Sequence, residues 1–170
     1  PGQPKRYDYE YERHGTCNLF MICQPLAGWR QVKVTARRTK VDFAECMREL
    51  VDVHFPHAEV IRVVLDNLNT HTKGAFYEAF PPDVARDYLR RLAFCYTPKH
   101  GSWLNVAECE LSCLTSQCLR GRRIGELTEL QSEIAMWSAK TNAKQRSVDW
   151  QFKIDDARTK LKRLYPKIKA

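Results

Sequence analysis

The sequence predicts an α/β fold built on a mixed sheet, in which some strands run parallel and others antiparallel. Two strand-like segments follow each other closely near the start, and two further apolar segments stand apart from them. Amphipathic helical patterns lie between and after these segments. The resulting order of strand, strand, helix, strand, helix, strand and further helices is typical of an α/β sheet with mixed strand directions.

The first two strands are predicted to form a hairpin. Residues 16–23 contain a continuous apolar run at 19–22, which is typical of a strand buried on both faces, and residues 32–36 alternate between apolar and polar. The segment 24–29 between them contains proline and glycine. We therefore expect an antiparallel pair joined by a tight turn.

A helix and a buried strand come next. Asp42 is predicted to start the helix, with Glu45 three residues later as in a capping box, and Pro56 ends it. The face that carries Phe43, Cys46, Met47 and Leu50 is predicted to point inward. Residues 60–65 form a short, β-branched and almost wholly apolar segment, as expected of a central parallel strand covered by helices on both faces.

The second half of the chain is predicted to be mainly helical, with one more strand. The expected elements are a helical region at about 74–92 broken near Pro81-Pro82, a strand at 92–97, a helix capped by Asn105 with Leu111, Leu114 and Cys118 inward, a helix around 127–137, and a last helix in which Ile154, Ala157, Leu161 and Leu164 share one face.

Length and composition favour a globular protein. A chain of 170 residues with 44% hydrophobic and 28% charged residues is sufficient for one packed domain with a short appendage. No apolar run approaches the roughly 20 residues that cross a bilayer, so we expect a cytoplasmic protein without a membrane partner. The seven cysteines form no Cys-x-x-Cys pair, which argues against a zinc ribbon, and we expect them to be reduced and mostly buried.

The positive charge is concentrated at the C-terminal end. Residues 140–170 contain ten Lys or Arg and three Asp, so they carry +7 of the formal net charge of +8. We therefore predict a domain at 1–139 and a basic helical appendage at 140–170. A basic appendage on a nearly neutral body is typical of proteins that bind a polyanion, although a solvated helix face explains the charge alone equally well.

Two acidic residues stand where an α/β sheet places its ligands. Asp66 follows the most apolar strand, and Glu108 follows the turn after the strand at 92–97. Paired carboxylates at neighbouring strand ends suit Mg²⁺ or Mn²⁺, which prefer oxygen ligands. Structural roles remain open at this point, since Asp66 suits a turn and Glu108 suits a capping box with Asn105. The helical phase places Glu108 nearer the inward face than Glu110.

Three segments resemble a known family. They are Tyr11-Glu12-Arg13-His14-Gly15-Thr16, Val64-Leu65-Asp66-Asn67-Leu68-Asn69-Thr70-His71, and Tyr96-Thr97-Pro98-Lys99-His100-Gly101-Ser102-Trp103-Leu104-Asn105-Val106-Ala107-Glu108. They are similar to the bacterial insertion-sequence transposases of the mariner-like group, the IS-six-thirty family. The similarity continues through Val148-Asp149-Trp150 and Leu161-Lys162-Arg163-Leu164-Tyr165-Pro166.

The resemblance implies a ribonuclease-H-like fold and a metal-dependent enzyme. Asp66 and Glu108 match the second and third members of that family's Asp/Asp/Glu triad, which implies that they bind two Mg²⁺ or Mn²⁺ ions and are catalytic. The implied reaction is phosphodiester cleavage at transposon ends followed by strand transfer, with DNA as partner, in the bacterial cytosol near the nucleoid. A homodimer is compatible with this assignment.

The first aspartate of that triad has no counterpart in this sequence. In the family it lies on a first strand upstream of the segment that begins here at Tyr11, and the ten residues before Tyr11 contain two prolines and no apolar run. Asp8 matches the linker after that strand and is not assigned as catalytic. We therefore expect a mixed sheet that lacks its central strand, with free edges on the Leu19 and Val63 strands, and little or no activity from this chain by itself.

Further residues are candidates for contacts with nucleic acid. Those near the two carboxylates are His71, Lys99, His100, Ser102, Trp103 and Asn105, and those in the basic appendage are Lys160, Lys162 and Arg163. For Asn105 a plain helix cap is an equally good interpretation, and for Trp103 a packing role is the more common one. The alternative functions are another ribonuclease-H-like nuclease that acts on RNA or hybrids, and a non-enzymatic DNA-binding remnant of a transposase.

Overall fold

The computed structural model describes residues 15–98, 101, 104–160 and 162. The elements in chain order are β1 (Asn18–Gln24), the 3₁₀ turn η1 (Pro25–Ala27), β2 (Trp29–Thr35), α1 (Lys40–Glu49), the π-helical turn η2 (Leu50–His54), β3 (Ile61–Leu65), α2 (Gly74–Ala79), α3 (Pro82–Arg91), β4 (Leu92–Tyr96), α4 (Ala107–Leu114), the π-helical turn η4 (Thr115–Leu119), α5 (Leu127–Ala143) and α6 (Ile154–Lys160).

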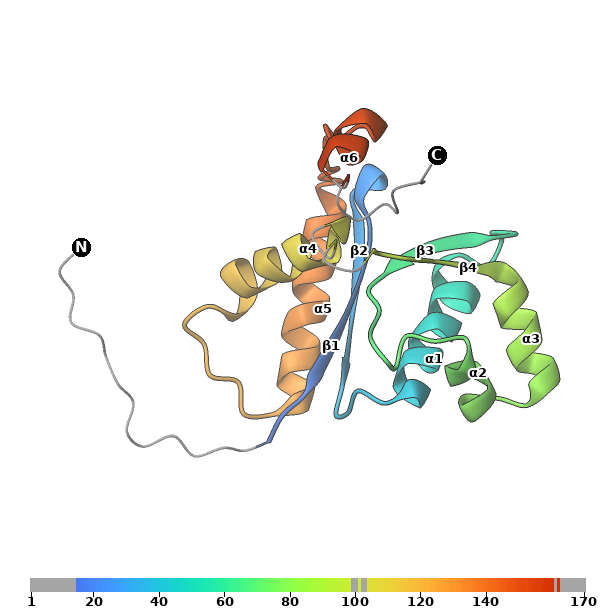
Figure 1. Ribbon diagram of the computed structural model, residues 1–170. Helices are drawn as coiled ribbons and strands as arrows, with labels where there is room; N and C mark the ends of the chain where they lie inside the picture. The colour runs from blue at the N-terminus through green and yellow to red at the C-terminus, as the bar shows by residue number, and fades with distance from the viewer. Residues whose placement is uncertain (1–14, 99–100, 102–103, 161, 163–170) are drawn as a thin grey trace.

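The predicted hairpin is confirmed. β1 and β2 are antiparallel, in a register that runs from Asn18 opposite Thr35 to Gln24 opposite Trp29. Helices cover both faces, with α1 on one side and α4 and α5 on the other (Figure 1). The expectation that β1 is buried on both faces is nevertheless wrong, because only Phe20 of β1 is buried. The other side chains of β1 are half-buried, apart from one exposed residue at its end. Among the described residues β1 pairs only with β2, so its other edge is free.

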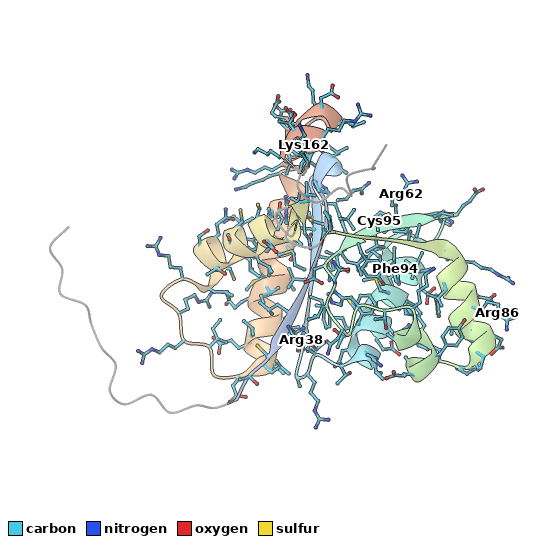
Figure 2. The ribbon with its side chains drawn as sticks, viewed as in Figure 1. Arg38, Arg62, Arg86, Phe94, Cys95 and Lys162 are labelled. Carbon is cyan, nitrogen blue, oxygen red and sulfur yellow. The ribbon has the colours of Figure 1, made fainter. Side chains whose placement is uncertain are left out.

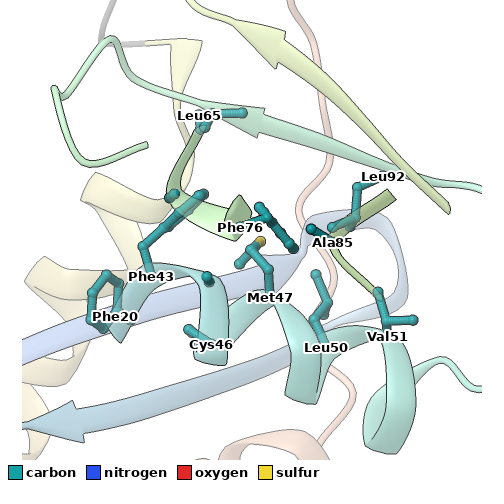
Figure 3. Packing of buried hydrophobic residues seen from close by; sticks show 12 residues of the cluster. Phe20, Phe43, Cys46, Met47, Leu50, Val51, Leu65, Phe76, Ala85 and Leu92 are labelled. Atoms are coloured by element: carbon teal, nitrogen blue, oxygen red, sulfur yellow. The ribbon is translucent and has the colours of Figure 1, made fainter. Parts of the chain in front are cut away.

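Helix α1 forms the centre of the main core, although it begins earlier than predicted. Thr39 is its N-cap: the Thr39 side chain accepts a hydrogen bond from the Asp42 backbone N–H, and the Asp42 carboxylate accepts one from the Thr39 N–H. The capping box therefore consists of Thr39 and Asp42 rather than Asp42 and Glu45. The predicted inward face is confirmed, since Phe43, Cys46, Met47 and Leu50 are all buried (Figure 3).

Strands β3 and β4 form a parallel pair, with Ile61 opposite Leu92 and Leu65 opposite Tyr96. One face of this pair packs on the core with α1, α2 and α3. The other face exposes Arg62 and Val64, and Arg62 projects away from the helices (Figure 2). The prediction of a strand covered on both faces is therefore wrong for the described part of the chain.

The remaining helices lie close to their predicted positions. Pro82 starts α3 after a break behind α2, as expected. In α4 and η4, Leu114 and Cys118 are buried and Leu111 is half-buried. In α6, no residue is buried, and Ile154, on the predicted apolar face, is exposed. Leu161 and Leu164, predicted on the same face, lie outside the described residues.

Two small sheets flanked by helices make up the structure, which is consistent with the predicted α/β, ribonuclease-H-like class. One sheet consists of β1 and β2 and the other of β3 and β4, and within the described residues the two sheets share no hydrogen-bonded strand. The same core nevertheless joins them, because Phe20 of β1 and Leu65 of β3 both pack on α1 (Figure 3). No helix in the described part of the chain is long and apolar enough to span a bilayer.

The cysteines differ from the prediction. All seven are free, but only Cys46 and Cys118 are buried and Cys23 is half-buried. The exposed ones are Cys17, Cys95, Cys109 and Cys113. Small apolar side chains are tolerated on an exposed helix face or at a strand end, so the expectation of mostly buried cysteines is wrong here.

The C-terminal appendage is fixed to the hairpin at its base. Helix α5 runs across residue 140, so the boundary between residues 139 and 140 stays a prediction. Beyond α5, the Val148 N–H donates to the Pro25 carbonyl at 2.8 Å, and the Asn142 side chain exchanges two hydrogen bonds with the Arg30 backbone. Gly28 lies so close to this segment that a Cβ atom there would come within 2.6 Å of the Gln145 carbonyl carbon.

Candidate active site

The parallel register of β3 and β4 brings two loops to one edge of the sheet. Asp66 follows β3 directly and Thr97 follows β4 directly. The Thr97 N–H donates to the Leu65 carbonyl at 2.9 Å, and the Asn67 side-chain amide donates to the Thr97 carbonyl at 2.6 Å. These bonds extend the pairing one residue beyond the strands and fix where Asp66 begins its loop.

The Asp66 carboxylate is held on one side and open on the other. Its Oδ1 lies 2.7 Å from Nδ1 of His71 and accepts the Leu68 N–H at 3.3 Å. The side chain is 45% exposed, and within the described residues its second oxygen has no hydrogen-bond partner. An exposed carboxylate with one free oxygen fits a hard cation or a solvated phosphate–metal complex.

The histidine that contacts Asp66 is itself well packed. Its side chain is 18% exposed, and its ring lies 4.7 Å from the Phe43 ring at an interplanar angle of 30°. The Tyr96 hydroxyl donates to the His71 carbonyl at 2.8 Å. His71 is therefore placed as a support for the Asp66 carboxylate, while its predicted contact with nucleic acid stays a prediction.

A turn connects this edge to the helix that carries the second predicted carboxylate. The Gly101 N–H donates to the Pro98 carbonyl at 2.8 Å, and the Leu104 N–H donates to the Gly101 carbonyl at 3.0 Å. A Cβ atom at Gly101 would lie 2.7 Å from Cγ of Pro98, so this tight turn favours glycine. Lys99, His100, Ser102, Trp103 and Arg163, predicted to contact nucleic acid, lie outside the described residues.

The start of α4 decides which of its two glutamates faces solvent. Asn105 accepts the Ala107 N–H through its side chain at 3.2 Å, which supports its interpretation as a local cap. Glu108 is exposed in the first turn, and Glu110 is buried. The predicted phase was therefore wrong: Glu110 shares the inward face with Leu114, four residues further on, and Glu108 faces outward.

The buried glutamate has a structural partner that the sequence did not reveal. Glu110 receives two hydrogen bonds from the Arg30 guanidinium, at 2.7 Å and 3.0 Å. The same guanidinium donates to the carbonyls of Gly28 and Arg146. Because the ion pair occupies both oxygens of Glu110, Glu108 is the carboxylate of α4 that is available to a ligand.

The candidate site therefore consists of two acidic side chains: Asp66, directly after β3, and Glu108, in the helix that follows β4. Along the chain, the turn at Gly101 leads from the end of β4 to the first turn of α4, which carries Glu108. Within the described residues, no group of three His, Cys, Asp or Glu side chains is placed to hold a metal ion. The assignment of Asp66 and Glu108 as ligands stays a prediction.

The appendage residues predicted to bind nucleic acid are on the surface. Lys160 lies 5.8 Å above the Phe152 ring, and Lys162 is exposed near the end of α6 (Figure 2). Neither lies in the elements that carry Asp66 and Glu108.

Comparisons with known proteins add one finding. No curated protein and no solved structure matches the chain. The family model described as DDE superfamily endonuclease matches residues 1–131, which is most of the chain and includes Asp66, His71 and Glu108. With its mixed α/β fold and its acidic strand end, the chain belongs to the DDE superfamily endonucleases.

Proposed function

We propose that this chain is the catalytic part of a DNA transposase, and that Asp66 and Glu108 bind the divalent metal ion on which cleavage depends. The observation that carries the proposal is the position of Asp66, half-exposed at the carboxyl end of β3 beside the parallel strand β4. Ligands of open α/β sheets bind at such edges. Glu108 supports it, since its side chain is exposed in the first turn of the helix that follows β4.

The residues around Asp66 are suited to present it. His71 and the Leu68 N–H both contact Oδ1, which orients the carboxylate, and the Asp66 side chain is still 45% exposed. Mg²⁺ or Mn²⁺, bound as a pair, would supply an activated nucleophile and a stabilised leaving oxygen for phosphodiester cleavage. The oxygen donors of Asp66 and Glu108 match the preference of these cations.

The finer assignment is to the IS-six-thirty transposases. It rests on the motifs around Asp66 and Glu108 and on the basic C-terminal segment. It includes cleavage at transposon ends and strand transfer, with DNA in the bacterial cytoplasm as partner and a homodimer as the assembly.

Direct Mn²⁺ binding tests the two ligands without requiring turnover. Mn²⁺ titrations of the 170-residue chain, followed by electron paramagnetic resonance, should detect one class of site that Asp66→Asn and Glu108→Gln each weaken by at least about tenfold. Both changes remove a charged oxygen ligand and keep the size of the side chain. Glu129→Gln is a matched control, because Glu129 also lies in the first turn of a helix and is exposed. Asp83→Asn in α3 is the control for Asp66.

Two outcomes would refute the assignment of these ligands. One is an unchanged Mn²⁺ affinity in Asp66→Asn, and the other is an equal loss of affinity in the two control variants. His71→Ala should weaken Mn²⁺ binding less than Asp66→Asn does, because it removes only the support of the carboxylate.

The activity of the chain by itself is a separate part of the proposal. We expect little or no Mn²⁺-dependent nicking of supercoiled DNA, because the described residues bring no third carboxylate to Asp66 and Glu108. Robust nicking that Asp66→Asn abolishes would overturn this expectation. The same observation favours a second candidate function, DNA binding without cleavage, for which the chain should retain duplex affinity in the Asp66→Asn variant. Cleavage of an RNA–DNA hybrid in preference to DNA would indicate a different nuclease.

A further inference from the structure

One part of the chain outside the family match combines exposed aromatic and basic side chains. The segment that follows α5 and ends with α6 lies beyond residues 1–131. Trp150 is 44% exposed there, and its ring stands edge-to-face to that of Phe152, with centroids 6.4 Å apart and an interplanar angle of 87°. A partly exposed indole beside a second ring presents a flat apolar surface on which a ligand ring can stack.

Hydrogen bonds at two of its residues fix this segment to the β1–β2 hairpin. The Val148 N–H bonds to the Pro25 carbonyl, and Arg30 bonds to the Arg146 carbonyl at 3.2 Å. The segment therefore lies against the turn of the β1–β2 hairpin, with α6 beyond that turn and far from α3 (Figure 1). Trp150 comes two residues after this anchor, which limits the freedom of its backbone.

Basic residues that lie close to Trp150 in the sequence favour an anionic partner. Lys144, Arg146 and Lys153 are exposed, and within the described residues no carboxylate forms an ion pair with them. The acids of α6 are engaged locally: Asp155 pairs with Arg158, and Asp156 accepts the Lys153 N–H. Asp149 is the one acidic side chain adjacent to Trp150 in sequence. Leu26, in the hairpin turn, and Ile154 are exposed apolar side chains as well.

We propose that Trp150 and the basic residues Lys144, Arg146 and Lys153 form a binding surface for single-stranded nucleic acid, on which Trp150 stacks with a base. Aromatic stacking combined with lysine and arginine contacts to phosphates is how proteins bind single strands without sequence preference. A duplex keeps its bases stacked inside, so the indole adds nothing to duplex binding. An apolar protein partner is disfavoured by the cluster of cations.

Fluorescence anisotropy with the full 170-residue chain tests this surface. The probes are a labelled 20-nucleotide thymidine strand and a labelled 20-base-pair duplex, each measured at two salt concentrations. Trp150→Ala should weaken binding of the single strand by about tenfold and leave duplex binding within twofold. Trp150→Phe should retain most of the affinity, because phenylalanine also stacks.

A second pair of variants separates stacking from charge. Lys144→Gln combined with Lys153→Gln should reduce the slope of log affinity against log salt for the single strand by about 1.4. Tyr77→Ala is the matched control, since Tyr77 is an exposed aromatic residue on α2, outside this surface. Circular dichroism melting curves should show that all variants are folded.

The proposal is overturned by any of three results. They are an undetectable affinity of the wild-type chain for the single strand at low salt, a Trp150→Ala effect no larger than that of Tyr77→Ala, and an equal loss of single-strand and duplex affinity in Trp150→Ala. None of these results bears on Mn²⁺ binding by Asp66, and loss of that metal site leaves this surface intact. The two proposals therefore fail independently.

Discussion

Arg30 of β2 and Glu110 of α4 form a buried, two-pronged ion pair that joins elements far apart in the sequence. Their side chains are 4% and 9% exposed, and Nε of Arg30 lies 2.7 Å from Oε2 of Glu110. The remaining guanidinium hydrogens are directed to the carbonyls of Gly28 and Arg146. One side chain thus links the hairpin, the helix that carries Glu108, and the base of the C-terminal segment.

Removing either partner should destabilise the protein strongly. Arg30→Met leaves the Glu110 carboxylate buried without a counter-charge, and Glu110→Leu leaves the Arg30 guanidinium buried without one. Each variant should lose about 3–5 kcal/mol of the free energy of unfolding, and the double variant should lose clearly less than the sum of the two. Urea unfolding followed by circular dichroism measures all three values.

A surface pair provides the control for this cycle. Arg90 and Asp87 on α3 are also an arginine–carboxylate pair, with side chains 70% and 73% exposed. Arg90→Met should change the free energy of unfolding by less than about 1 kcal/mol. If Arg30→Met costs no more than Arg90→Met, the buried pair does not have the role assigned to it.

The sequence contained a signal that Glu110 is buried, but the predicted orientation of the helix did not use it. Leu114 and Cys118 were predicted inward, and Glu110 precedes Leu114 by four residues, which places it on the same face. The prediction instead compared Glu108 with Leu111, which is only half-buried. A buried glutamate needs a partner from another element, and a single sequence does not identify Arg30 as that partner.

Local patterns predicted the elements well and their surroundings less well. The antiparallel hairpin, the parallel strands β3 and β4 and the break before Pro82 follow from apolar periodicity and turn residues. The exposure of Val64 could not be predicted in this way, because it depends on whether another element covers that face of the sheet. For the candidate site, the position of Asp66 at the end of β3 was predictable, but its contact with His71 is set by the loop.

Gly28 should tolerate no side chain. Its φ is +65°, and a Cβ atom there would lie 2.6 Å and 2.8 Å from backbone carbons of Gln145 and Arg146. Gly28→Ala should therefore lower the free energy of unfolding by more than about 1 kcal/mol, through the left-handed backbone alone, with the backbone contact adding to it. Differential scanning calorimetry of the purified variant measures the loss.

Gly125 is the matched position for that experiment. It has no atom within 4 Å of a built Cβ and no positive φ. Gly125→Ala should leave the melting temperature nearly unchanged or raise it slightly. A loss at Gly28 no larger than the roughly 1 kcal/mol expected from the left-handed backbone alone would show that the C-terminal segment does not pack against the hairpin turn as described.

The smaller core cluster, on the α5 side of the hairpin, should depend on Leu114. Leu114 is fully buried with Val32, Val34, Ile134 and Trp137. Leu114→Ala should reduce the free energy of unfolding by about 2–5 kcal/mol, because it removes buried methyl groups and leaves a cavity. Leu26→Ala, at an exposed leucine in η1, should cost less than about 0.5 kcal/mol in the same urea titration. Similar costs for both would contradict the position of α4 against the hairpin.

The thiols of Cys23 and Cys46 should react slowly with alkylating reagents near neutral pH. Burial raises the pKa of Cys23 to about 11, with the Glu110 carboxylate adding to the shift, and burial raises the pKa of Cys46 to about 12. At pH 8 both are therefore almost entirely protonated, and iodoacetamide reacts with the thiolate. Mass spectrometry should show rapid labelling of Cys17, Cys95, Cys109 and Cys113 and slow labelling of these two.

The same pKa shifts predict how stability depends on alkaline pH. Because the thiol pKa values are raised in the folded state, the folded protein holds these protons more tightly than the unfolded chain, whose cysteines titrate near 9. Their contribution to stability is complete below pH 9 and is lost as the pH rises toward 11 and 12. The urea midpoint should fall over this range, and it should fall less in Cys46→Ala than in Cys17→Ala, where an exposed thiol is removed. An identical alkaline decline in both variants would show that the Cys46 thiol is not protonated more tightly in the folded protein.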